Sequence, residues 1–379
     1  MKYKALKDIA TITMGQSPNS SSYNEEKNGM PFYQGNADFG ELYPTARVWC
    51  SNPKKIAKEN DILISVRAPI GALNYATEEC CIGRGLAAIT IENDAERNYV
   101  FHFLKAQNKE LNNKGTGSTF KAISKSVLEE VQVPVISKEQ QEISMKLMDI
   151  IEQIIHQRKQ ELQRLDELIQ ARFVEMFGSL NDNEKGLDIL SIEELCTLIK
   201  DGTHQTPIYT DDKQNGVKFL SSKDVMTQKI CWDEIKYIPA ELHEKLYATI
   251  QPIRNDILMS KNGVNYGVAA VNDTDEIFDI YVSLALLRPK TDKVNPVYLK
   301  CAINNPDTKC QFDSSIKGIG VPNLHLGEIK KTKILVPSMD KQNTFVAFIE
   351  QVDKSKVAVQ KALDETQLLF DSLMQKYFG

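Results

Sequence analysis

Two lysine-rich loops hold the residues of this chain that are best suited to contact a nucleic acid. Each contains a Gly-x-Gly step, Gly115-Thr116-Gly117 in one and Gly318-Ile319-Gly320 in the other. Residues 109–126 and residues 309–333 each carry a local charge of +3. Phosphate contacts require a local basic face, whatever the charge of the whole chain. An ordinary solvated surface is the alternative interpretation.

The sequence lacks the common signatures of bond-making chemistry. It has no Walker-type phosphate loop and no His-Glu-x-x-His motif. The Gly115-Thr116-Gly117 step does not open a βαβ unit, so no nucleotide is expected there. No Pro-Pro pair occurs, although base-flipping amino-methyltransferases line their pocket with an Asn/Asp-Pro-Pro-aromatic run. We therefore expect this chain to be non-catalytic by itself.

Candidate metal ligands and nucleophiles are isolated from one another. The five histidines are scattered, the seven cysteines are irregularly spaced, and no Cys-x-x-Cys occurs, so the sequence indicates no metal and no cofactor. The acidic pairs Asp211-Asp212 and Asp273/Asp275 are better explained as turn formers than as nuclease carboxylates. His204 lies in a loop at residues 201–207, where a structural or DNA-contacting role is favoured.

The two loops belong to two copies of one sequence pattern. Five motifs recur in the same order, with offsets between 187 residues (Gly29 to Gly216) and 203 residues (Gly117 to Gly320). The matching segments are 28–32 with 215–219, 61–65 with 256–260, 115–117 with 318–320, 133–134 with 336–337 and 177–178 with 378–379. So long a period excludes a solenoid and indicates two homologous domains.

Each copy is predicted to be a mixed α/β domain followed by a long helix. Short strands, a helix near residues 98–112 or 296–303, the Gly-x-Gly loop and a closing strand follow in order. Serine caps at Ser137 and Ser338 then open two segments without Pro or Gly. Each is expected to form a helix of about 40 residues, about 60 Å long.

Apolar residues recur every three or four positions along both helices, in stripes narrow enough for a coiled-coil seam. The fold class is therefore α+β, with two domains joined by two antiparallel helices in a coiled coil, a pseudo-twofold internal repeat. Burial of each helix in its own core is the alternative. The expected boundaries are 1–136 for the first domain, 137–178 for its helix, 179–337 for the second domain and 338–379 for the last helix.

The composition suits a reducing, cytoplasmic setting. The net charge is −5, no apolar run approaches the roughly 18 residues of a membrane span, and the N-terminus does not resemble a signal peptide. An odd number of cysteines, two of them adjacent at Cys80-Cys81, favours buried free thiols over disulfides.

The chain resembles the specificity subunits of type I restriction-modification systems. The matching features are the Asp-Gly-Thr-His-x-Thr-Pro segment at residues 201–207, the Asn-Gly-x-x-Phe strand after it, the Asp-Ile-Leu strands at Asp61 and Asp256, the Val-Pro steps and the Phe-Gly helix ends. In that family two target recognition domains each bind half of a split DNA sequence, and the helices set the spacing and bind the methyltransferase subunits.

The resemblance implies double-stranded DNA with a bipartite target, adenine methyltransferase subunits (two of them expected) and restriction/translocase subunits as partners. Base recognition needs hydrogen-bonding side chains on loops that enter a groove. The candidates are Gln34, Asn36, Ser65, Arg67, Ser118, Thr119, Lys121, Thr203, His204, Ser221, Lys223, Lys261, Asn262, Lys317 and Asn323. Lysines are expected mostly on phosphate, and Gln, Asn and Arg more often on bases. Ser65 and its counterpart Ser260 could equally be ordinary strand-end residues.

Two other functions remain open. The first is a stand-alone nuclease or methyltransferase, which the missing motifs oppose. The second is a structural adaptor that binds only proteins, which the acidic net charge favours.

Overall fold

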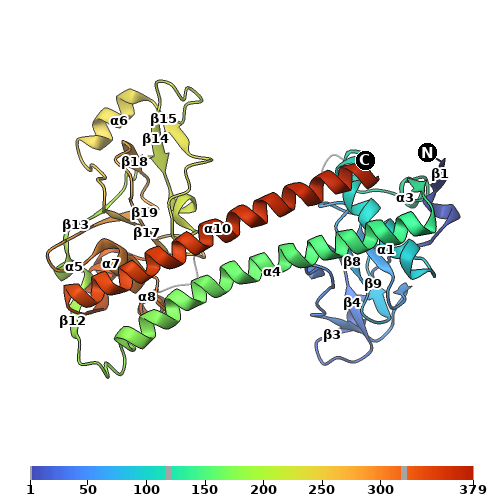
Figure 1. The fold of residues 1–379 in the computed structure, drawn as a ribbon, viewed down its shortest axis with the longest axis horizontal. Coiled ribbons are helices and arrows are strands. Elements are labelled where there is room, and N and C mark those ends of the chain that lie inside the picture. The colour runs from blue at the N-terminus through green and yellow to red at the C-terminus, as the bar shows by residue number, and fades with distance from the viewer. Residues whose placement is uncertain (1, 117–120, 317–321, 379) are drawn as a thin grey trace. The chain divides into compact units, whose positions relative to one another are not determined.

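The computed structural model describes residues 2–116, 121–316 and 322–378. The chain divides into two compact units. Unit 1 comprises residues 1–160 and 360–379, and unit 2 comprises residues 161–359. Two 40-residue helices, α4 (Lys138–Phe177) and α10 (Met339–Phe378), are each continuous and give one part to each unit. Figure 1 draws α4 in green and α10 in red.

Unit 1 contains three small sheets. An antiparallel four-stranded sheet has the order β2 (Thr11–Met14), β10 (Leu86–Thr90), β7 (Ile62–Ser65) and β8 (Leu73–Tyr75). A five-stranded sheet has the order β3 (Tyr23–Asn24), β5 (Trp49–Cys50), β4 (Met30–Tyr33), β9 (Cys80–Ile82) and β6 (Ile56–Ala57). The third pairs β1 (Lys2–Ala5) with β11 (Gln132–Val135). The helices before α4 are α1 (Asp94–Ala106), α2 (Asn108–Asn113) and α3 (Lys125–Glu129).

Unit 2 repeats this plan. Its four-stranded sheet has the order β13 (Cys196–Asp201), β19 (Leu284–Pro289), β16 (Ile257–Ser260) and β17 (Ala269–Val271). A three-stranded sheet has the order β15 (Lys236–Ile238), β14 (Val217–Leu220) and β18 (Phe278–Ile280). The third pairs β12 (Asp188–Ser191) with β20 (Lys333–Val336). The helices are α5 (Ile192–Leu195), α6 (Ala240–Tyr247), α7 (Pro296–Ile303), α8 (Pro306–Ser315) and α9 (Leu326–Lys331).

The two units share the four-stranded sheet and the pairing of the first strand with the closing strand. Each has a parallel pair, β4 with β9 and β14 with β18. In each unit a buried tyrosine joins a helix to the closing strand. Tyr99 of α1 donates a hydrogen bond to the carbonyl oxygen of Pro134 in β11 at 3.2 Å. Tyr298 of α7 donates one to the carbonyl oxygen of Leu335 in β20 at 2.7 Å. The prediction of two mixed α/β domains of one kind is therefore confirmed.

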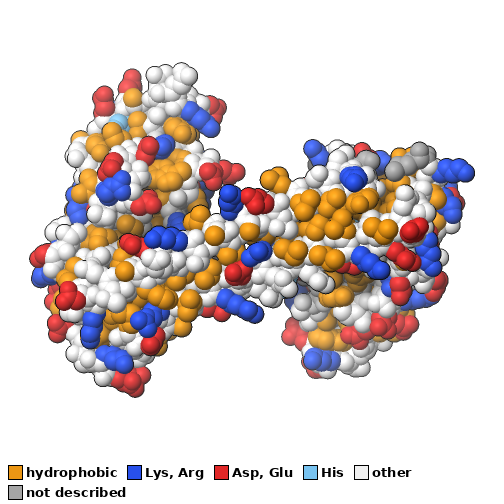
Figure 2. All heavy atoms as spheres, in the orientation of Figure 1, with side chains coloured by type: hydrophobic (Ala, Val, Ile, Leu, Met, Phe, Trp, Pro, Cys, Tyr) orange, Lys and Arg blue, Asp and Glu red, His pale blue; other side chains and the backbone are white. Residues whose placement is uncertain are grey.

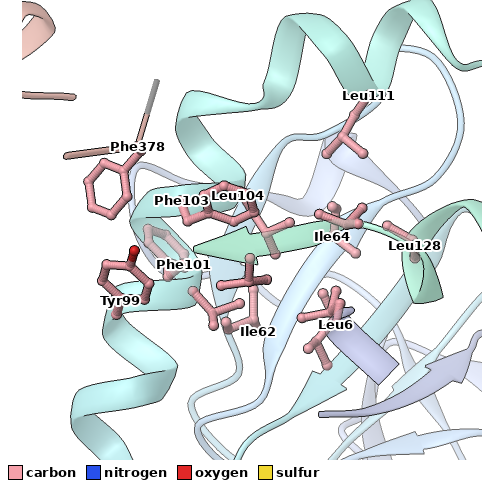
Figure 3. Close-up of a cluster of buried hydrophobic side chains, with 14 of the residues drawn as sticks. Leu6, Ile62, Ile64, Tyr99, Phe101, Phe103, Leu104, Leu111, Leu128 and Phe378 are labelled. Atoms are coloured by element: carbon pink, nitrogen blue, oxygen red, sulfur yellow. The ribbon is translucent and has the colours of Figure 1, made fainter. Parts of the chain in front are cut away.

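The core of unit 1 includes residues from both long helices. Met148 and Ile151 of α4 share one buried cluster with Phe370 and Phe378 of α10. In Figure 3 the Phe378 ring lies beside the Tyr99 ring of α1, with centroids 5.3 Å apart. The first part of α4 and the last part of α10 thus complete the hydrophobic core of unit 1.

Unit 2 receives the opposite helix ends. Phe173 and Phe177 of α4 pack around Phe345 of α10 and Tyr298 of α7, with ring centroids 5.1 to 6.3 Å apart. Lys356 of α10 also pairs with Asp166 of α4. Within each unit, therefore, the beginning of one long helix meets the end of the other.

The α4 stripe is only partly buried. Its N-terminus has the predicted serine cap, in which Ser137 Oγ accepts a hydrogen bond from the Gln140 amide at 3.2 Å. However, Ile143, Ile154 and Leu168, which belong to the apolar stripe predicted along this helix, are 58%, 36% and 46% exposed. The buried face of α4 in unit 1 contains Met145, Met148, Ile151 and Ile155, because the domain core covers that side of the helix. No helix in the described ranges combines the length and apolarity of a membrane span.

Candidate nucleic-acid interface

Five backbone segments of unit 1 meet at one end of its four-stranded sheet. These segments, 15–17, 34–36, 66–68, 83–85 and 121–123, are called here the unit 1 loop cluster. The Gly83-Arg84-Gly85 turn lies between the others. Its links are Gly83 N to Tyr33 O at 2.8 Å, Val66 N to Gly85 O at 2.9 Å and Ile123 N to Val66 O at 3.0 Å. Loops tied to one another in this way can hold side chains at fixed positions.

Unit 2 has the same arrangement in segments 202–204, 221–223, 261–263, 281–283 and 322–324, called here the unit 2 loop cluster. The equivalent links are Tyr281 N to Leu220 O at 2.9 Å, Lys261 N to Ser283 O at 2.9 Å and Leu324 N to Lys261 O at 2.8 Å. The internal repeat thus extends to individual backbone hydrogen bonds.

Two polar side chains brace each cluster in the same manner. Ser65 Oγ donates to the Pro69 carbonyl at 2.6 Å and accepts from the Ala72 amide at 2.9 Å. Ser260 Oγ makes the same pair of bonds to Asn265 and Val268 at 2.8 and 3.0 Å. Asp38 and Asp224 each accept a hydrogen bond from the amide that follows the preceding strand, at 2.7 and 2.8 Å. These residues form the frame of the clusters.

Four of the predicted unit 1 residues lie on the accessible side of the cluster. Gln34 follows β4 and is exposed, and Asn36 begins a short 3-10 helix and is half-buried. Arg67 and Lys121 are exposed. The Ala68 amide donates to the Lys121 carbonyl at 3.2 Å. The structure therefore brings Gln34, Asn36, Arg67 and Lys121 together.

In unit 2 the structure gathers Thr203, His204, Asn262 and Asn323. Thr203 pairs with Tyr281 in an isolated bridge, and His204 is 75% exposed. Asn262 Nδ2 donates to Asn323 Oδ1 at 3.2 Å, and Asn262 Oδ1 has no hydrogen-bond partner among the residues that the structure describes. Ser221 is half-buried and donates to Asp224 at 3.1 Å.

Three of the candidates have partners within their own unit. Ser65 is 1% exposed, and its hydroxyl is occupied within its own turn. Lys261 is 5% exposed and paired with Asp201, so its ammonium group is not available to a phosphate. Lys223 is exposed, but it donates to Asp224 at 2.6 Å and to the Glu234 carbonyl at 3.0 Å. These side chains stabilise the loops. Ser118, Thr119 and Lys317 lie outside the described residues.

Sequence reasoning missed the central turn of each cluster. Arg84 is exposed in the central turn of the unit 1 loop cluster, and Val282 occupies the equivalent position in the unit 2 loop cluster. Ser17, which accepts a hydrogen bond from the Arg84 amide at 3.3 Å, corresponds to His204. The signal in the sequence is Gly83-Arg84-Gly85, a charged residue between two glycines. The second copy has Tyr281-Val282-Ser283 at this position, so the signal is not part of the repeated pattern.

The described residues include no group of three or more His, Cys, Asp or Glu side chains placed to share a metal ion. Burial raises the pKa of the Cys80 and Cys196 thiols to about 12, and burial also raises the pKa of Cys81 to about 11. These three thiols are therefore protonated near neutral pH, and a protonated thiol is a poor nucleophile.

The chain belongs to the family defined by the type I restriction modification DNA specificity domain, whose model matches residues 1–164 and 184–366. It is similar to a putative type I restriction enzyme MjaX specificity subunit from Methanocaldococcus jannaschii, with 41% identity over 156 residues, or 41% of this chain and 37% of that relative. It is also 19% identical to the type I restriction enzyme EcoBI specificity subunit from Escherichia coli, across 99% of this chain and 84% of the relative.

The fold is also found in a solved structure. The crystal structure of the type I restriction-modification system S subunit from M. genitalium matches 100% of this chain and 96% of its own chain, with 14% identity and a TM-score of 0.55. At that identity the match shows a shared fold alone.

Proposed function

We propose that this chain is the specificity subunit of a type I restriction-modification complex, and that each unit binds one half of a bipartite target in double-stranded DNA. Partner subunits then methylate adenine or restrict the DNA, and this chain makes no bonds itself. Membership of the family supports this assignment. The expected cytoplasmic location is part of the same proposal.

One observation carries the proposal. The two loop clusters have the same backbone hydrogen bonds but different side chains at equivalent positions: Gln34 and Ser221, Arg67 and Asn262, Arg84 and Val282. A constant frame with variable donors and acceptors is what two readers of different base sequences require, because bases are distinguished by the groups on their groove edges.

Lys121 supports a second kind of contact. Its side chain is exposed beside Arg67, and it makes no ion pair within the described ranges. Lysine in such a position suits a phosphate oxygen, which fixes the register of the protein on DNA and carries no sequence information.

The long helices are proposed to pair as an antiparallel coiled coil, to set the number of unread base pairs and to bind the methyltransferase subunits. The helix ends shared within each unit support antiparallel pairing. Ile143, Ile150 and Ile154 of α4 are 58%, 54% and 36% exposed. In Figure 2 hydrophobic side chains gather on the visible face of unit 1, where its parts of the long helices lie. A contiguous apolar face of this kind marks a protein contact.

Selection from random duplex DNA tests the proposal. The chain, purified in complex with a methyltransferase subunit, is expected to enrich one motif made of two defined blocks and an undefined gap. A single continuous block would show that one unit alone binds DNA. Association with the methyltransferase subunit without any enrichment would favour the structural adaptor.

A further inference from the structure

Arg84 occupies the most constrained position of the unit 1 loop cluster. A Cβ atom on Gly85 would lie 2.3 Å from the Gln34 carbonyl oxygen, and one on Gly15 would lie 2.2 Å from the Gly83 carbonyl oxygen. Gly85 in the turn and Gly15 on the neighbouring segment therefore allow close backbone packing that a side chain would prevent. The backbone of Arg84 is held while its side chain projects into solvent.

The guanidinium group of Arg84 is also uncommitted. It makes no hydrogen bond or ion pair with any residue in the described ranges. Three basic groups in or beside the clusters are paired instead: Arg47 with Asp38, Lys223 with Asp224 and Lys261 with Asp201. Burial raises the pKa of the Tyr23 hydroxyl, and the positive charge of Arg84 opposes that rise.

The equivalent position in unit 2 is Val282, which has no side-chain donor. The DNA backbone presents the same phosphates to both units, whereas two different half-sites present different bases. A difference at the centre of an otherwise conserved frame indicates a role in distinguishing the two half-sites. Arg67 adds a second exposed guanidinium on the neighbouring segment, where unit 2 has Asn262.

We infer that Arg84 reads a guanine in the half-site bound by unit 1, by donating two hydrogen bonds to O6 and N7 in the major groove. Arginine is the most frequent partner of guanine, because its planar fork matches these two acceptors. The inference rests on the proposed function and assigns a base to one of its two sites. Unit 2 has Asn262 at the position of Arg67, with Asn323 beside it, and such amide groups are of the kind that pair with adenine.

The test compares Arg84→Gln and Arg84→Lys with the unchanged chain in the same selection from random DNA, each in complex with the methyltransferase subunit. In the unchanged chain, one position of one half-site is expected to be guanine. Arg84→Gln should lower the preference for that guanine about 5- to 150-fold. Arg84→Lys keeps the charge but not the fork, so part of the loss should remain. The other half-site should not change with either variant.

Lys4→Ala provides the control, because Lys4 is an exposed cation on β1, outside the loop cluster. It should leave the guanine preference intact. Uniformly weaker binding with an unchanged motif, restored by Arg84→Lys, would identify a phosphate contact and overturn the inference. An unchanged motif and affinity would also overturn it. A bipartite motif from the unchanged chain would still support the proposed function in either case, whereas its absence would overturn that function.

Discussion

The Lys261 ammonium group and the Asp201 carboxylate form an ion pair at the unit 2 loop cluster, where only 6% and 19% of the two side chains are exposed. The pair joins the end of β13 to the segment that follows β16. It also neutralises a lysine that the sequence alone assigns to phosphate. Whether a lysine is free to bind phosphate therefore depends on its ion-pair partner in the fold, which its position in the sequence does not show.

Asp201→Asn is expected to lower the free energy of unfolding by about 3 kcal/mol, because it leaves a buried ammonium group without its counter-charge. Urea unfolding followed by circular dichroism would measure the change. His204→Ala is the control, since His204 lies 3.6 Å from the same carboxylate but is 75% exposed. It should change stability by less than about 0.5 kcal/mol. Equal effects of the two substitutions would show that the ion pair does not hold the loops.

Ile150→Asp is expected to weaken binding of the methyltransferase subunit about tenfold or more, because an apolar contact is replaced by a charge. Ile150 is 54% exposed, so the thermal midpoint of the free chain should stay nearly constant. Isothermal titration with the purified methyltransferase subunit would measure the affinity. Lys146→Ala, an exposed change on the same helix, should have little effect. Full affinity for Ile150→Asp would remove this face of α4 from the interface.

Insertion of four residues after Gln160 and after Val359 should lengthen the unread gap by about two base pairs, with both half-sites retained. Four helical residues add about 6 Å, and each base pair adds about 3.4 Å. Both insertions fall where the chain passes from one unit to the other. Motif selection with the lengthened chain would report the gap. The same motif with an unchanged gap would refute the proposal that the helices set the spacing.

Thiol labelling checks the burial of the cysteines. Brief treatment of the native chain with iodoacetamide at pH 8 should modify the exposed Cys231 and Cys310 first. Cys80 and Cys196 should stay unmodified, because a pKa raised to about 12 leaves almost no thiolate at that pH. Mass spectrometry of peptides would identify the sites, and labelling in urea would show that all thiols can react. Rapid modification of Cys80 in the native chain would contradict the described packing.

Much of the fold could be predicted because it follows from local patterns. The strand at β7 and the helix α7, which begins at a proline after an asparagine cap, are indicated by residues next to one another in the sequence. The long helices are similarly indicated by 40 residues without Pro or Gly. The predicted helix at 98–112 is instead two helices, α1 and α2, separated at Gln107, because the periodicity does not show a single residue leaving helical geometry.

The site was less predictable, because it depends on partners far apart in the sequence. Lys261 lies 60 residues from Asp201, and the residues next to either one in the sequence do not predict the ion pair. Ile143 and Ile154 belong to the apolar stripe predicted along α4, yet they are exposed. The spacing of apolar residues does not show which side of the helix the domain core covers. The repeated motifs do not indicate Arg84, because the second copy has Val282 at the equivalent position.

Mapping of methylated adenines tests the central claim most directly. The chain would be co-expressed with its methyltransferase subunit in a host that lacks other adenine methylation, and modified adenines would be located across the genome. The proposed function predicts one motif with two defined parts and a gap of fixed length. Methylation at a single uninterrupted motif, or none from a complex shown to assemble, would contradict the claim that each unit reads half of the target.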